Sequence, residues 1–98
     1  PIIYIVPKPS PSRWNLKGQY SIINQRMKKF CDENENKYYF DSWSIMLDEK
    51  GDIPTRYFWK DMLHMNSSGY EVWTKNLKPL IKKITFYHVS LLAFLISR

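Results

Sequence analysis

The chain has 98 residues, enough for one domain and too few for two. Its apolar fraction of 44% and aromatic fraction of 16% exclude a disordered chain, and the single cysteine excludes an internal disulfide. A formal charge of +6 is compatible with a nucleic-acid or anionic-surface partner, but the fifteen Lys and Arg residues are scattered, as on a solvated basic surface.

The N-terminal residues predict a buried strand followed by a loop. Ile2–Val6 is apolar at every position, as in a strand that is covered on both faces of a parallel sheet. The next segment, Pro7–Ser12, holds three prolines and is expected to be a loop without helix. The apolar run begins directly after Pro1 with no charged segment before it, so it does not indicate a signal peptide. We expect that part of the domain precedes Pro1.

A helix and a second strand are expected next. Gln19–Glu33 has the spacing of an amphipathic helix, with apolar side chains at Tyr20, Ile23, Met27 and Phe30. Lys37–Asp41 is rich in aromatic residues and predicts a strand. The order strand, helix, strand predicts a parallel pair with a right-handed crossover. Two strands bury too little surface to be stable alone, so we expect more of the sheet upstream.

The middle of the chain predicts short, irregular elements. Ser42–Leu47 favours a short helix, Asp48–Asp52 a turn, and Thr55–Lys60 an irregular aromatic stretch. A longer helix is expected to start near Asn66 or Ser68, where Ser68 and Glu71 match a capping box.

The expected core face of that longer helix consists of Tyr70, Trp73 and Leu77, while Lys75, Lys78 and Lys82 face water. Pro79 is expected to end or kink the helix, or to open another.

The last residues form a hydrophobic tail. Ile84–Ile96 is almost continuously apolar, and thirteen helical residues would extend roughly 20 Å, less than the ~30 Å hydrocarbon core of a bilayer. We therefore expect a buried helix or strand and not a membrane span. His88 within it is interpreted as a hydrogen-bonded core histidine or a tail histidine, and not as a ligand.

An acid and a histidine stand three residues apart just before the longer helix. A hydrolytic triad needs a hydroxyl nucleophile, an imidazole that takes its proton, and a carboxylate that orients the imidazole. Asp61 and His64 have the chemistry and the spacing for the last two roles. By itself, the spacing also fits a surface ion pair or a cap.

The residues around the pair carry a resemblance. The block Asp61-x-x-His64-x-Asn66-x-x-Gly69-Tyr70-x-x-Trp73 resembles the last conserved block of the SGNH hydrolases, also called GDSL-type esterases and lipases. The similarity extends from about Pro1 to Lys83, through Ile3–Trp14 and the segment Tyr39–Leu47.

The resemblance implies a fold and an activity. The fold is α/β, here the C-terminal part of a three-layer α/β/α flavodoxin-like sandwich, covering residues 1–83, with 84–98 as a tail of unknown role. The activity is hydrolysis of small-molecule, lipid or carbohydrate esters by a serine enzyme without a cofactor. Asp61 and His64 match its catalytic acid and base, whereas the Ser, Gly and Asn blocks would lie in a missing N-terminal part.

Other residues are candidates for roles in such a site. Ser10 and Ser12 lie among prolines, which lack the amide donors of an oxyanion hole, and Ser67 and Ser68 are interpreted as helix caps. Arg13 and Trp14 are expected to border the substrate cleft, because loops at the carboxyl ends of strands do so in open α/β sheets. Asp61, His64 and His88 do not have the spacing of a metal site.

Two alternative functions remain open at this point. A basic module could bind single-stranded nucleic acid through the aromatic and cationic residues of Lys37–Phe40 and Arg56–Lys60. A membrane-associated fragment could use Ile84–Ile96, with Lys82 and Lys83 at its edge.

Overall fold

Two short parallel strands form the centre of the structure, a computed structural model that describes the backbone of residues 1–96 and the side chains of residues 1–88. β1 (Ile2–Ile5) pairs with β2 (Lys37–Phe40) so that Ile2 lies opposite Lys37. The predicted parallel pair is confirmed. β2 ends one residue earlier than expected because the Asp41 carboxylate accepts hydrogen bonds from the next turn, at the amides of Trp43 and Ser44.

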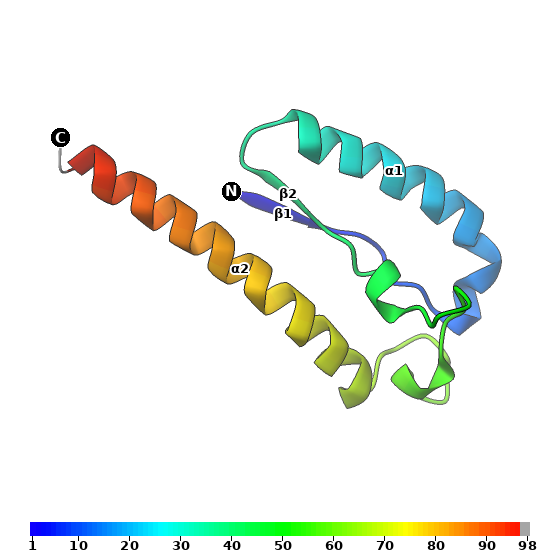
Figure 1. Ribbon diagram of the computed structural model, residues 1–98. Coiled ribbons are helices and arrows are strands. Elements are labelled where there is room, and N and C mark those ends of the chain that lie inside the picture. Colours follow the sequence, from blue (N-terminus) through cyan, green and yellow to red (C-terminus); the bar gives the residue numbers. More distant parts are fainter. Residues whose placement is uncertain (97–98) are drawn as a thin grey trace.

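The helix α1 (Lys17–Glu33) connects the two strands and packs mainly against β2 (Figure 1). It confirms the predicted helix and starts two residues before the expected Gln19. Cys31 is buried on its inner face, with Sγ 3.7 Å from the carbonyl oxygen of Tyr38. Ile23 and Phe30 of the predicted apolar face are about half exposed, so the described residues cover this face only in part.

The proline-rich segment is not entirely a loop, which corrects the sequence-based expectation. A 3-10 helix, η1 (Pro11–Leu16), begins inside it with Pro11 in its first turn. The first residues of a helix have no intrahelical acceptor for their amides, so a proline there loses no hydrogen bond. A proline is therefore compatible with the first turn of a helix.

The core of the C-terminal half lies where several short elements meet the start of α2. Met46, from η2 (Ser44–Met46), packs with Phe58 and Met65, and this cluster is extended by Ile45, Ile53, Tyr57, Val72 and Trp73. The Trp73 indole nitrogen lies 3.4 Å from the Met46 sulfur. Trp73 therefore belongs to the core, as predicted. The expected short helix at Ser42–Leu47 is confirmed in this shorter form. The aromatic stretch that was expected to be irregular contains a third 3-10 turn, η3 (Thr55–Tyr57).

The long helix α2 (Ser67–Ile96) starts at the first of the two predicted positions, directly after Asn66. Asn66 caps it, because its side-chain oxygen accepts a hydrogen bond from the Gly69 amide at 3.1 Å. The expected caps at Ser67 and Ser68 are wrong, since both residues are already helical. Tyr70 is not part of the core, because it is 57% exposed and lies one position away from the buried Gly69.

Pro79 neither ends the helix nor opens a new one, which is a second correction. It lies inside α2, which continues for more than a dozen residues beyond it. Proline removes the hydrogen bond to the carbonyl four residues earlier, at Lys75. Lys75 and Pro79 are both exposed, so water can solvate that carbonyl in place of the lost amide.

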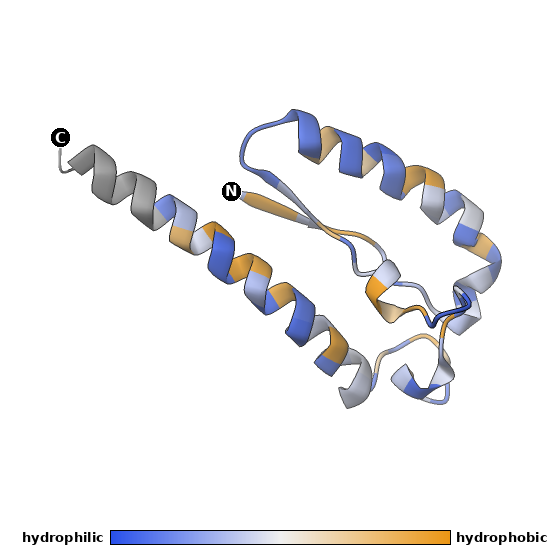
Figure 2. Cartoon of the chain, viewed as in Figure 1, coloured by the Kyte–Doolittle hydropathy of each residue, from blue (hydrophilic) through white to orange (hydrophobic). Residues whose placement is uncertain are grey.

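The far half of α2 extends past the strands, as Figure 1 shows, and gives the molecule a longest dimension of 56 Å. Figure 2 shows apolar and polar positions alternating along α1 and along the coloured part of α2, and apolar residues at the start of β1. None of the helices in residues 1–96 combines the length and the apolar character of a membrane span. α2 runs without a break across the expected domain boundary between residues 83 and 84. That boundary stays a prediction. Residues 97 and 98 of the tail lie outside the described residues.

Candidate active site

Asp61 and His64 lie in the loop that connects η3 to α2, here called the 57–66 loop. The backbone closes on itself: the Trp59 amide donates to the His64 carbonyl, and the Met62 amide donates to the Trp59 carbonyl, both at 2.9 Å. Phe58 and Met65 form an antiparallel bridge on either side and are buried in the core. The two buried residues hold the ends of the loop while its tip stays in solvent.

The Asp61 carboxylate organises the tip of the loop. Its Oδ1 accepts hydrogen bonds from the backbone amides of Leu63 and His64, each at 3.0 Å. Met62, between them, has a φ of 57°, in the left-handed region that non-glycine residues rarely adopt. The turn therefore depends on the polar bonds of Asp61, which offset the strain of about 1–3 kcal/mol that such a conformation carries.

The same turn places the acid against the histidine. Oδ2 of Asp61 lies 2.5 Å from Nδ1 of His64, a short contact of the charge-assisted kind. The hydrogen bond from His64, followed by those from the two amides, lowers the pKa of Asp61 to about 2, so the carboxylate is ionised at neutral pH. It therefore accepts the Nδ1 proton, and Nε2 becomes the imidazole nitrogen that can accept a proton from another group. The His64 side chain is 73% exposed.

Asn66 and Gly69 fix the end of the loop to the start of α2. The side-chain amide nitrogen of Asn66 donates to the carbonyls of Arg56 and Phe58, at 2.9 and 3.3 Å. A Cβ atom at Gly69 would lie only 2.6 Å from the carbonyl oxygen of Tyr57. Only glycine permits this approach of helix and loop. Both residues belong to the sequence block that carries the resemblance, and the structure gives each a local physical role.

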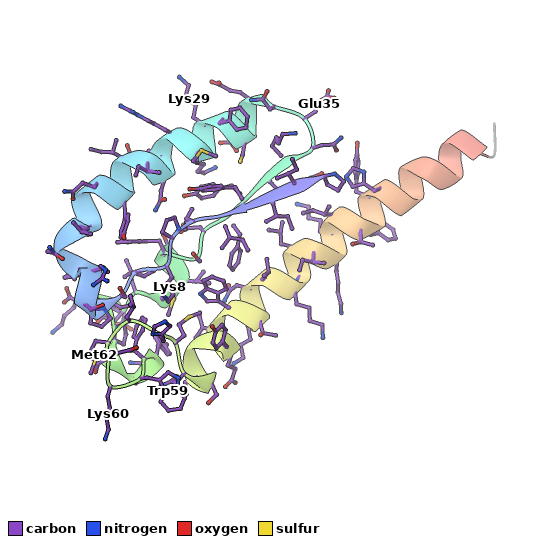
Figure 3. All side chains as sticks on the ribbon, turned by 180° about the vertical axis from the view of Figure 1, so that it is seen from behind. Lys8, Lys29, Glu35, Trp59, Lys60 and Met62 are labelled. Carbon is purple, nitrogen blue, oxygen red and sulfur yellow. The ribbon has the colours of Figure 1, made fainter. Side chains whose placement is uncertain are left out.

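The N-terminal loop contacts the 57–66 loop from the side. The Ser12 amide donates to the Met62 carbonyl at 3.0 Å. Lys8 is partly buried nearby; burial lowers its pKa, and the negative charge of Asp61 partly opposes that shift. Figure 3 shows Lys8, Trp59, Lys60 and Met62 at one end of the molecule, away from Lys29 and Glu35. Sequence spacing gave no indication of Lys8 or of Met62, because the first is more than fifty residues from Asp61 and the second is an ordinary apolar residue in the sequence.

The two expected cleft residues lie next to this contact. Arg13 directly follows Ser12, is exposed, and donates its backbone amide to the Ser10 carbonyl at 3.2 Å. The Trp14 ring stacks on Trp43 with 5.7 Å between centroids, and the Lys17 ammonium lies 5.0 Å from its centroid. The role of both residues in substrate binding stays a prediction, and Trp14 already has two neighbours that hold its ring.

The serines of the chain differ in accessibility. Ser10 is buried and Ser12 is exposed, while Ser67 and Ser68 are exposed in the first turn of α2. His64 has Asp61 as its side-chain partner in the described residues, and none of these four serines has a hydrogen bond to it there. The expectation that the nucleophile lies elsewhere stays a prediction.

The aromatic and basic stretches of the alternative nucleic-acid surface, Lys37–Phe40 and Arg56–Lys60, make several contacts within the chain. Phe40 and Phe58 are buried, the Lys28 ammonium lies 5.8 Å from the Tyr39 ring centroid, and the Arg56 guanidinium lies 4.6 Å from that of Tyr57. Burial, followed by the charge of Asp41, raises the pKa of Tyr39 to about 12. Phe40 and Phe58 therefore pack within the fold, Tyr39 and Tyr57 are half-buried, and Trp59 is 61% exposed.

Comparisons with known proteins do not assign the chain. It matches no protein-family model, and no curated protein or solved structure shows significant similarity to it. Among the residues that the structure describes, no three His, Cys, Asp or Glu side chains are grouped to hold a metal ion. The geometry of the Asp61–His64 pair is thus the main indication of function.

Proposed function

We propose that the chain supplies the catalytic acid and base of a serine-dependent ester hydrolase of the SGNH type. The observation that carries the proposal is the 2.5 Å contact between Asp61 Oδ2 and His64 Nδ1, in a turn whose other carboxylate oxygen accepts two backbone amides. An ionised acid held in this way fixes one imidazole tautomer, which is what a general base requires. A surface ion pair does not need this degree of anchoring.

In the proposed reaction, His64 works through Nε2. It takes the proton from a serine hydroxyl as that oxygen attacks the ester carbonyl, and it then gives the proton to the leaving alcohol. Asp61 stays ionised, holds Nδ1–H and stabilises the imidazolium that forms between the two steps. Water then attacks the acyl-enzyme ester with His64 again as the base, and the serine is released. Acyl and acetyl esters of small molecules, lipids or carbohydrates fit this chemistry.

The proposal places the serine and the oxyanion-hole donors in a segment outside these 98 residues, within a three-layer α/β/α sandwich. Two features support the idea of a larger sheet. In the described residues β1 has a paired strand on one edge only, and its Ile2 and Ile5 side chains are exposed. An open apolar hollow of about 250 Å³ lies between β1 and α1, with Ile3, Met27 and Phe30 in its wall. Further strands and their helices would cover both.

The first test is activity by complementation. The 98-residue chain alone should not turn over a short-chain chromogenic ester, because the loss of even one oxyanion donor costs roughly 10²–10³ in rate. A chimaera in which the N-terminal part of a characterised SGNH hydrolase precedes Pro1 should hydrolyse it. Exposed histidines can cleave activated aryl esters slowly, so the baseline is free imidazole at the concentration of the chain.

In the active chimaera, His64→Ala should reduce kcat by about 10³-fold or more, and Asp61→Asn should reduce it severely while the fold is retained. The matched control is His88→Ala, which removes the other histidine of the chain and should leave kcat unchanged. Turnover by the chain alone that survives His64→Ala would show that the site is wrong. Turnover by the chain alone that is lost in Ser10→Ala or Ser12→Ala would show that the nucleophile is internal.

A further inference from the structure

The second half of α2 presents apolar side chains that the described part of the molecule does not cover. Ile84 is the last buried residue of α2 in the described range, at 6% exposure. Phe86 and Tyr87, directly after it, are 75% and 57% exposed. Figure 1 shows this part of α2 extending beyond the strands and α1. Large aromatic side chains in this position indicate a contact surface.

A row of lysines lies on α2 directly before these aromatics. Lys75, Lys78 and Lys82 follow helical spacing and line one shallow groove of the helix surface. Lys75 is paired with Glu71 at 3.7 Å, whereas no ion pair engages Lys78 or Lys82 within residues 1–88. Phe86 follows Lys82 by one helical turn, so the lysine row leads directly to the exposed ring.

The sequence beyond Phe86 continues without charged residues as far as Ile96. Residues 89–96 read Val-Ser-Leu-Leu-Ala-Phe-Leu-Ile and contain no charged side chain, and the backbone is helical through Ile96. One continuous helix therefore has a basic section followed by an apolar section, with the change at Lys83 and Ile84. The apolar section is about 20 Å long, shorter than the ~30 Å core of a bilayer.

We propose that this end of α2 binds the surface of an anionic lipid bilayer. Lys78, Lys82 and Lys83 would lie among the headgroups, and Phe86 and Tyr87 would enter the interface, where aromatic side chains are favoured. Each lysine near an anionic leaflet accounts for roughly a fivefold change in affinity. A second copy of the chain fits less well, because a parallel contact along this face would bring the lysine rows of two helices together.

The proposal goes beyond the hydrolase function and does not depend on it, because it uses none of the residues of the 57–66 loop. The apolar section by itself would be compatible with many partners. The adjoining lysines, which have no ion pair within residues 1–88, favour one of them, a surface that is negatively charged outside and apolar within.

The test is co-sedimentation of the 98-residue chain with vesicles of phosphatidylcholine containing phosphatidylserine, compared with phosphatidylcholine alone. The chain should bind the anionic vesicles, and binding should weaken with salt. Lys78→Gln with Lys82→Gln should reduce the affinity about 30-fold, by the fivefold change for each lysine. Phe86→Ser with Tyr87→Ser should abolish most of the remaining binding.

The matched control is Lys28→Gln with Lys29→Gln, which removes the same charge from the exposed face of α1, and circular dichroism verifies the helix content of every variant. Full binding by this control supports the proposal. An equal loss in both lysine variants would overturn it, since the attraction would then be nonspecific. A wild-type chain that forms dimers and ignores vesicles, with dimers lost in the Phe86/Tyr87 variant, would show instead that a second copy covers this end.

Discussion

Within ten residues, the 57–66 loop makes three backbone hydrogen bonds of 2.9 Å, buries Phe58 and Met65, and receives a further bond from Ser12. The second half of α2 has regular helical hydrogen bonds and one buried side chain, Ile84, among residues 81–88. The irregular segment is thus the better anchored of the two. Regular secondary structure does not by itself show that a segment is held in place, whereas cross-bonded turns can fix side chains on a small core.

The largest expected effect locates where α2 stops contributing to the fold. Ile84→Ala should lower the free energy of unfolding by about 2–4 kcal/mol, because it removes a buried side chain and leaves a cavity. Phe86→Ala, two residues later, should change it by no more than about 0.5 kcal/mol, since Phe86 is exposed. Urea unfolding followed by circular dichroism measures both. Equal losses at the two positions would show that α2 contributes to the stability of the fold beyond Ile84.

A smaller effect is expected where α2 meets the loop. Gly69→Ala should destabilise the chain by about 1–3 kcal/mol, because the new methyl group would lie 2.6 Å from the Tyr57 carbonyl oxygen, a backbone atom with little freedom to move. Gly18→Ala in α1 is the control, since a Cβ there meets no atom within 4 Å. It should cause no loss of stability. A neutral Gly69→Ala would contradict the rigid contact between loop and helix.

The smallest effect concerns the charge at the tip of the loop. The pKa of Asp61 is lowered to about 2 in the folded chain from an ordinary value of 3.8, so the folded state favours the ionised carboxylate. This contribution to stability is complete above about pH 4 and is lost as the pH falls toward 2. The difference in unfolding free energy between wild type and Asp61→Asn should therefore shrink over that interval. A difference that stays constant between pH 5 and pH 2 would show that the hydrogen bonds of Asp61 are not formed in solution.

The sequence predicted the structure correctly where a local pattern of residues determines it. The apolar run at Ile2–Val6, the periodic helix before Lys37 and the β-α-β order were enough to predict the parallel pair. The spacing of Asp61 and His64 predicted their contact, because three residues of a turn bring two side chains together. These predictions rest on interactions that are close in sequence or on a strong general rule.

The features that sequence did not predict depend on contacts between distant residues or on solvent exposure. Pro79 is tolerated because its surroundings are exposed, and a local rule for proline contains no information on exposure. Tyr70 has the period of a core residue but lies next to the face that packs, as the buried Gly69 shows. Lys8 and Met62 gain their positions from the meeting of two loops.

The closed geometry of the 57–66 loop has a consequence for the order of folding. The contacts that hold Asp61 against His64 join residues no more than ten positions apart, whereas β1 and β2 pair across 35 positions, from Ile2 to Lys37. Closing a short loop costs less chain entropy and occurs sooner than pairing distant parallel strands. Pulse-labelled hydrogen exchange should therefore find the Trp59 and Asn66 amides protected before those of Lys37–Phe40. Asp61 and His64 would then be in contact before the sheet is formed.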